Sequence, residues 1–228
     1  AGNGSYTYTN GQTVTNPNGA TSGTTYLYAQ WNSASVKLPT ATLPGYTFLG
    51  WYDAATGGNK IGGAGDSYTP TAAKTLYAHW QANKITVKFS GNGSTGGATA
   101  DQVFTYDSAQ ALRANGFSRA YTVTYSGNFA GKTPTLGATS QTATYTFKNW
   151  NNAVAGNGSY TYTNGQTVTN PNGATSGTTY LYAQWNSASV KLPTATLPGY
   201  TFLGWYDAAT GGNKIGGAGD SYTPTAAK

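Results

Sequence analysis

The sequence predicts a mainly β fold of the α+β class, built from small domains in tandem. Repetition is the first reason: residues 1–74 recur letter for letter as residues 155–228, so the 228-residue chain holds about one and a half copies of a 154-residue unit. Composition is the second, because 32 Gly, 19 Tyr and many Thr, Ser and Asn residues favour strands and tight turns over long helices. The third is a period of two in the apolar residues.

Three segments are predicted to form strands, two of them by this period. Residues 84–89 place their apolar side chains on one face and polar groups on the other, and residues 121–125 alternate in the same way with threonine outward. Both predict half-buried strands. Residues 46–52 are apolar on both faces, which predicts a central strand that is covered on both sides.

Tryptophans mark a second, degenerate period inside the 154-residue unit. Trp51 and Trp150 each end a Thr-Phe-x-x-Trp segment, and a second segment follows that ends in Trp80 or Trp185. This alternation predicts short and long modules joined by connections of only a few residues. The expected division is 1–32 for the C-terminal part of a long module, 33–82 for a short module, 83–186 for a long module and 187–228 for a short module that lacks its last strand.

The long module is expected to contain two further elements. Asp107 or Ser108 can cap a short helix over residues 109–115, and Gly116 suits its left-handed end. Residues 120–144 predict an additional hairpin before the Thr-Phe-x-x-Trp segment resumes. The fold class is therefore antiparallel or mixed sheets with one short helix in the long module.

Charge and residue usage exclude several classes of function. The 12 Lys and Arg residues are spread along the chain, so no nucleic-acid partner is expected, and the absence of cysteine excludes thiol and disulfide chemistry. The six acidic residues and the single His79 offer no paired general acid and base, so no enzyme, metal site or cofactor is expected. The sequence contains no apolar run of membrane-spanning length, and we expect any secretion signal or anchor to lie outside this segment.

The residues singled out by the sequence are structural. Six tryptophans are expected to form the framework of the cores, namely Trp31, Trp51, Trp80, Trp150, Trp185 and Trp205. An intramolecular lysine–asparagine isopeptide bond is a further hypothesis, which requires a lysine and an asparagine buried in contact beside an acid. Its ingredients are Lys88, Lys148, Asn149 and Asp101.

One pattern closely resembles a known family. Residues 44–53, Pro-Gly-Tyr-Thr-Phe-Leu-Gly-Trp-Tyr-Asp, and residues 75–80, Thr-Leu-Tyr-Ala-His-Trp, are similar to the internalin-type B-repeat, also called the Listeria/Bacteroides repeat. The front half of that pattern is recognisable at residues 85–93 and 103–106. The resemblance implies a bacterial surface protein and a small β-grasp-like domain. The short module lacks its own front half, so we expect it to lean on the long module to complete its core.

Identical copies favour a structural role, because a stalk or a multivalent surface gains reach or avidity from each copy. We expect an extracellular stalk, spacer or fibre segment of a bacterial cell-surface adhesin, whose partners are neighbouring repeats of the same chain or fibre. The alternative is a multivalent repeat that binds cell-wall glycan or a host surface protein. Tyrosines such as Tyr6 and Tyr8 either pair across strands or form a ledge on which sugars stack.

Overall fold

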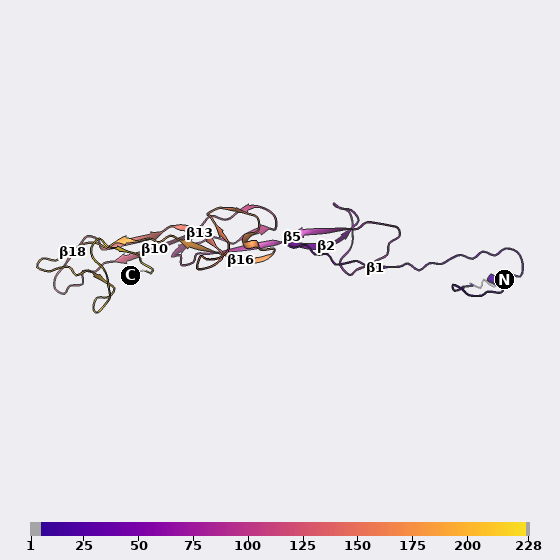
Figure 1. Ribbon diagram of the computed structural model, residues 1–228, viewed down its shortest axis with the longest axis horizontal. Helices are drawn as coiled ribbons and strands as arrows, with labels where there is room; N and C mark the ends of the chain where they lie inside the picture. The colour runs from indigo at the N-terminus through magenta and orange to yellow at the C-terminus, as the bar shows by residue number, and fades with distance from the viewer. Residues whose placement is uncertain (1–5, 227–228) are drawn as a thin grey trace.

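The chain forms a long, thin molecule, described for residues 6–226 by a computed structural model (Figure 1). Residues 6–32 lie at one end, strand β18 lies near the other, and the remaining strands follow one another along the long axis. Strands dominate, and the helical elements among the described residues are two three-residue 3₁₀ turns, η1 (Pro17–Gly19) and η2 (Pro171–Gly173). The prediction of a mainly β chain is confirmed.

The first sheet has three strands. Strand β2 (Tyr46–Tyr52) lies between β3 (Lys60–Gly62) and β5 (Tyr77–Ala82), while β1 (Val36–Lys37) pairs separately with β4 (Ser67–Tyr68). The central position predicted for residues 46–52 is therefore confirmed. The prediction that both faces of this strand are covered was wrong. Leu49 is 37% exposed, because both neighbours of β2 lie in its own sheet and no second layer covers this side chain.

The second sheet has five strands in the order β14-β13-β16-β6-β8. Their bounds are β6 (Lys84–Ser90), β8 (Gln102–Thr105), β13 (Phe147–Asn151), β14 (Thr161–Tyr162) and β16 (Gly177–Trp185). Strand β16 runs parallel to β6 and antiparallel to β13. The core of this sheet is fully buried at Ile85, Val87, Phe104, Trp150 and Leu181. The alternation predicted for residues 84–89 is confirmed.

A single residue separates the two sheets along the chain. Strand β5 ends at Ala82 and β6 begins at Lys84, so only Asn83 lies between them. The Asn83 backbone N–H donates to the Gly45 carbonyl at 2.9 Å, and its carbonyl accepts from the Tyr106 N–H at 2.9 Å. Asn83 is thus held from both sides, and the chain passes from one sheet to the next without a flexible linker.

The predicted additional hairpin is present. Strand β10 (Phe117–Thr124) pairs antiparallel with β12 (Ser140–Tyr145) and, at its start, with β7 (Gly96–Gly97). Val123 and Tyr125 are buried, and Thr122 and Thr124 are exposed, as the alternation of residues 121–125 predicted. The tip of the hairpin reaches the C-terminal strands, because β11 (Thr135–Leu136) pairs with β18 (Ala195–Thr196).

The helix predicted over residues 109–115 was wrong. This segment is extended and contains β9 (Gln110–Ala111), which pairs with β15 (Thr167–Val168). Its backbone donors are satisfied by other segments: Leu112 N–H donates to the Gln166 carbonyl at 2.9 Å, and Arg113 N–H donates to Gln102 Oε1 at 2.8 Å. A helix this short is unstable alone, and the extended form satisfies the same donors while burying Leu112.

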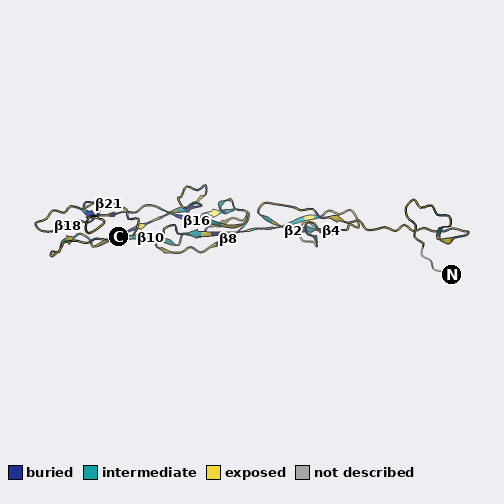
Figure 2. Cartoon of the chain, turned by 90° about the horizontal axis from the view of Figure 1, so that it is seen from below, coloured by how far each residue is buried: buried dark blue, intermediate teal, exposed yellow. Residues whose placement is uncertain are grey.

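The C-terminal strands form two short ladders that pack on the hairpin. Strand β17 (Val190–Lys191) pairs with β21 (Ser221–Tyr222), and β19 (Trp205–Tyr206) pairs with β20 (Lys214–Gly216). Their buried residues join those of the hairpin in one apolar cluster, which contains Val123, Tyr125, Ala143, Tyr145, Val190, Leu192 and Trp205. Figure 2 shows buried strands in this part of the molecule and in the five-stranded sheet, and mostly exposed or half-buried ones around β4.

Two identical stretches of sequence therefore meet different surroundings. Val190, which contacts the hairpin cluster, is 7% exposed, whereas its counterpart Val36 is 53% exposed. Leu38 and Leu192 are both buried, at 4% and 3% exposure. The hairpin thus adds its own buried contacts to a small core that exists without it.

This difference gives a matched test of the packing. Val190→Ala should lower the free energy of unfolding by about 2 kcal/mol, because it removes buried apolar volume. Val36→Ala should change it by less than about 0.5 kcal/mol, as expected at an exposed position. Urea unfolding followed by tryptophan fluorescence measures both. Equal shifts in the two variants would contradict the docking of the C-terminal strands on the hairpin.

Candidate functional site

The acidic side chains hold turns. Asp66 Oδ2 accepts a hydrogen bond from Gly63 N–H at 2.6 Å, and Asp53 Oδ1 accepts one from Asn59 N–H at 2.7 Å. The hydrogen bond from Asn59 is the main reason why the pKa of Asp53 lies below its usual range, with a smaller contribution from the charge of Lys74. Within residues 6–226, no three histidine or acidic side chains gather as metal ligands would.

His79 anchors a loop. Its ring stacks on Tyr52 with centroids 3.9 Å apart, and its Nε2 lies 2.9 Å from the Ala54 carbonyl. Gln184, at the equivalent place in β16, donates from Nε2 to the Ala153 carbonyl at 3.3 Å. Both side chains reach the loop that follows the neighbouring Thr-Phe-x-x-Trp strand, so this position has the same structural task in both sheets.

The six tryptophans occupy a range of environments. Trp150 is fully buried and Trp205 is 9% exposed, while Trp51, Trp80 and Trp185 are half-buried. Three of the indole N–H groups donate to backbone carbonyls: Trp51 to Pro39 and Trp205 to Pro193, both at 2.8 Å, and Trp185 to Gly91 at 3.0 Å. Trp31 differs from the rest, since 89% of its surface is exposed.

The structure does not gather the four isopeptide residues. Lys88 on β6 forms an ion pair with Asp101 at 3.7 Å, with both side chains about half exposed. Lys148 is exposed on β13, and Asn149 follows it in the same strand. Strand β16 separates β13 from β6 by about 9–10 Å across the sheet, and Asn149 lies opposite Gln184 whereas Lys88 lies opposite Tyr180, so the two residues are also displaced along the strands. The buried contact that the bond needs is absent from these four residues.

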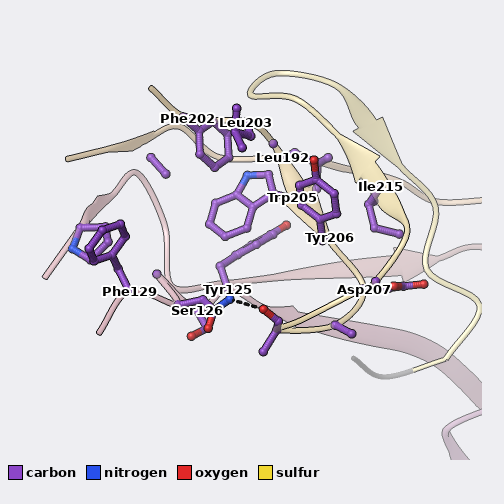
Figure 3. A pocket seen from close by; sticks show the side chains of 18 of the residues that line it. Tyr125, Ser126, Phe129, Leu192, Phe202, Leu203, Trp205, Tyr206, Asp207 and Ile215 are labelled. Atoms are coloured by element: carbon purple, nitrogen blue, oxygen red, sulfur yellow. Dashed lines mark hydrogen bonds between the residues drawn. The ribbon is translucent and has the colours of Figure 1, made fainter. Parts of the chain in front are cut away.

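An apolar groove lies where the hairpin meets the C-terminal strands (Figure 3). It has a volume of about 780 Å³, and Tyr125 and Trp205 face each other inside it with ring centroids 4.9 Å apart. Phe129 lies at its mouth and packs against Tyr200 at 4.7 Å. Asp207 is its sole charged lining residue among the residues described. Burial raises the pKa of Tyr125, so this ring stays neutral at physiological pH.

The groove is closed at its rim by contacts between segments far apart in sequence. Asn128 Nδ2 donates to the Ala209 carbonyl at 2.7 Å, and Lys132 Nζ donates to the Tyr200 hydroxyl at 3.2 Å. The same ammonium lies 4.5 Å from the centre of the Tyr200 ring. The groove was not predicted from the sequence, because it forms only where the hairpin packs against the C-terminal strands. The predicted additional hairpin was the one sequence feature that could have indicated it.

The groove borders residues 200–206, a copy of β2. In the first sheet, β5 pairs with one edge of β2. Residues 200–206 have no such neighbour among the residues described, since β19 pairs only with β20. As a result Leu203 is 71% exposed, against 37% for its counterpart Leu49. This side of the groove is therefore not paired with a second strand among the residues described.

Comparison with known proteins assigns the repeats to a family. A model of the Listeria-Bacteroides repeat domain matches residues 16–79 and 161–227, more than half of the chain. Internalin H of Listeria monocytogenes serovar 1/2a is 49% identical over 59 residues, which are 25% of this chain and 11% of that protein. The chain thus spans about a tenth of the length of this relative. No solved structure matches.

These similarities indicate a repeat segment of a bacterial surface protein. The repeat family is not an enzyme family, which agrees with the turn-forming roles of the aspartates. Among the described residues, no helix is long and apolar enough to span a bilayer.

The lowered pKa of Asp53 has a measurable consequence. Because the carboxylate is favoured in the folded state, its contribution to stability is fully present above about pH 4 and is lost as the pH falls through the folded pKa. Wild-type protein should therefore lose more unfolding free energy than Asp53→Asn between about pH 5 and pH 2. Urea midpoints over this range measure the difference, and parallel pH profiles would contradict the role given to Asp53.

Proposed function

Because the chain belongs to the Listeria-Bacteroides repeat domain family, we propose that it is an extracellular spacer, a stalk or fibre segment that holds other parts of a bacterial surface protein away from the cell. The observation that carries this proposal is the direct passage of β5 into β6 through Asn83. A stalk must keep its length, and a one-residue connection with both backbone groups bonded leaves little freedom to bend.

Side-chain contacts support the same junction. The Tyr46 hydroxyl donates to Asp107 Oδ2 at 3.2 Å, and the Tyr46 and Tyr106 rings meet edge to face at 5.5 Å. Thr47 Oγ1 donates to Asn83 Oδ1 at 2.7 Å, while Asn83 Nδ2 donates to the Thr175 carbonyl at 3.3 Å. These contacts resist rotation of one sheet about the connecting strand.

We further propose that the working unit is the pair of modules divided at residues 33–82 and 83–186, with residues 187–228 as the next short module. We describe the long module as β-grasp-like because its sheet contains the central parallel pair β6–β16. In this description the extended residues 107–116 replace the crossover helix. The hairpin then serves as the surface against which the next short module packs.

The spacer role predicts that length grows with copy number. Proteins with one, two and three copies of the 154-residue unit should show equal increments in maximum dimension by small-angle X-ray scattering. A jointed or collapsed array would instead grow more slowly with each copy. Such sublinear growth would contradict a stiff spacer.

The junction itself can be tested with an insertion. Adding Gly-Ser-Gly-Ser after Asn83 should broaden the distance distribution between spin labels placed in β2 and β13, because a flexible linker replaces the direct passage of β5 into β6. The same insertion in the exposed loop at Gly57 serves as the control and should leave the distribution unchanged. Equal widths in both proteins would show that Asn83 does not set the stiffness.

A binding role is the second candidate, favoured by two pairs of stacked tyrosines. Tyr160 and Tyr162 stack at 6.4 Å, as do Tyr180 and Tyr182, and Tyr160 and Tyr180 are 40% and 49% exposed. In each pair one ring, Tyr160 or Tyr180, is exposed, and it can stack on sugars of a cell-wall or host glycan. A glycan array probed with one-unit and three-unit proteins should then show a signal that rises with copy number and falls in Tyr180→Ser.

A further inference from the structure

The five-stranded sheet has one packed face and one open face. Along β6, Ile85 and Val87 are completely buried in the core. The alternate residues Lys84 and Lys88 are exposed. Along β16, Tyr180 is 49% exposed, although the residue that follows it is completely buried in the same core. Because successive side chains of a strand point to opposite faces, the two lysines and this tyrosine lie together on the open face.

The strand register places Tyr180 beside Lys88. Strands β16 and β6 are parallel, with Tyr180 opposite Lys88 and Thr178 opposite Thr86. Neighbouring strands lie about 4.8 Å apart, so one ligand can contact the tyrosine ring and the lysine ammonium together. The threonine pair adds hydroxyl groups next to them on the same face. The open face thus combines an aromatic ring, a cation and hydrogen-bonding groups.

The Tyr180 ring is held in place by its neighbour. Tyr182, which is half-buried, stacks on it with ring centroids 6.4 Å apart and an interplanar angle of 19°. Beyond Tyr182 the face is bounded by the loop after β13, because Gln184 Nε2 donates to the Ala153 and Val154 carbonyls, both at 3.3 Å. Tyr182 therefore orients the Tyr180 ring, and the exposed part of that ring remains accessible to a ligand.

The charges around this ring favour an anionic ligand. Residues 83–186 contain six Lys and Arg residues and two Asp residues, a net charge of +4. Lys88 pairs with Asp101 at 3.7 Å, and both side chains are about half exposed, so this pair can open to a competing anion. Lys84 Nζ donates to Thr105 Oγ1 at 2.6 Å. A lysine ammonium has three N–H donors, so Lys84 can bind an anion as well.

We propose that this face binds an acidic polysaccharide whose sugars carry carboxylates. Tyr180 stacks on one sugar ring, and the Lys88 ammonium pairs with the carboxylate beside it. Lys84 lies four residues away along the same strand, about 13 Å, and pairs with a carboxylate further along the polysaccharide. The inference rests on the glycan-binding role proposed above as the second candidate function, and it specifies the class of glycan.

A matched pair of ligands tests the requirement for charge. The full chain is titrated calorimetrically with oligogalacturonate and with its methyl ester, which has the same sugar ring but no carboxylate. The acid should bind at least about fivefold more tightly than the ester at low salt, because its carboxylates pair with lysine. This preference should shrink as salt is added. Equal affinities for the two forms, or no binding of the acid, would overturn the inference.

Substitutions of opposite sign test the two charged residues. Lys88→Gln should weaken binding of the acid by about fivefold and leave binding of the ester unchanged. Asp101→Asn should strengthen binding of the acid by about threefold, because it removes a negative charge and releases Lys88. Lys191→Gln, the control, removes the same charge from an exposed position on β17 and should leave both affinities unchanged. Acid affinities that stay the same in Lys88→Gln and Asp101→Asn would contradict the assignment.

The tyrosine is tested separately from the charges. Tyr180→Ser should weaken binding of the acid and of the ester alike, whereas Tyr180→Phe, which keeps the ring, should bind both as the wild type does. Full affinity in Tyr180→Ser would overturn the stacking role. The glycan array described above distinguishes the two levels of the proposal. An array without any signal contradicts glycan binding altogether, while binding of neutral sugars without preference for acidic ones contradicts this inference alone.

Discussion

The structure depends on the antiparallel pairing of two tryptophan-containing strands. It occurs twice, between β2 and β5 and between β13 and β16, with the same register and the same bulge. In both pairs the second tryptophan meets the phenylalanine of the first strand: Trp80 lies 5.2 Å from Phe48, and Trp185 lies 6.2 Å from Phe147. Small domains of this kind have few aliphatic side chains, so ring contacts fixed by a backbone ladder supply much of their order.

Neighbouring segments complete one another. Tyr145 on the hairpin donates its hydroxyl hydrogen to the Pro224 carbonyl, and Gly137 N–H donates to the Thr194 carbonyl at 2.8 Å. These bonds tie the C-terminal ladders to a hairpin that lies more than fifty residues earlier in the chain. Shared cores of this kind couple the stability of one segment to that of the next. The same coupling limits bending between the segments that it joins.

The period-two pattern predicted strands most reliably where one face of the strand packs against the core. Residues 84–89 and 121–125 were predicted because the alternation records which side meets the interior. The helix over residues 109–115 was wrong because its local signals, an acidic cap and a glycine stop, are equally compatible with an extended segment; Asp107 takes a positive φ of 57° outside any helix. The groove beside Trp205 could not be predicted, since its walls come from the hairpin and the C-terminal strands.

The repeated sequence shows which structural features are set by local contacts and which by tertiary contacts. Asn18 and Asn172 both take φ 56°, with ψ 24° and 21°, and each N–H donates to a tyrosine hydroxyl ten residues earlier, in Tyr8 and Tyr162. The sequence by itself determined these turns, because their hydrogen bonds join residues no more than ten positions apart in the chain. Tertiary structure decided whether the following residues became strand β16 or stayed exposed. A ladder needs backbone partners from distant segments, and residues 23–31 have none among the residues described.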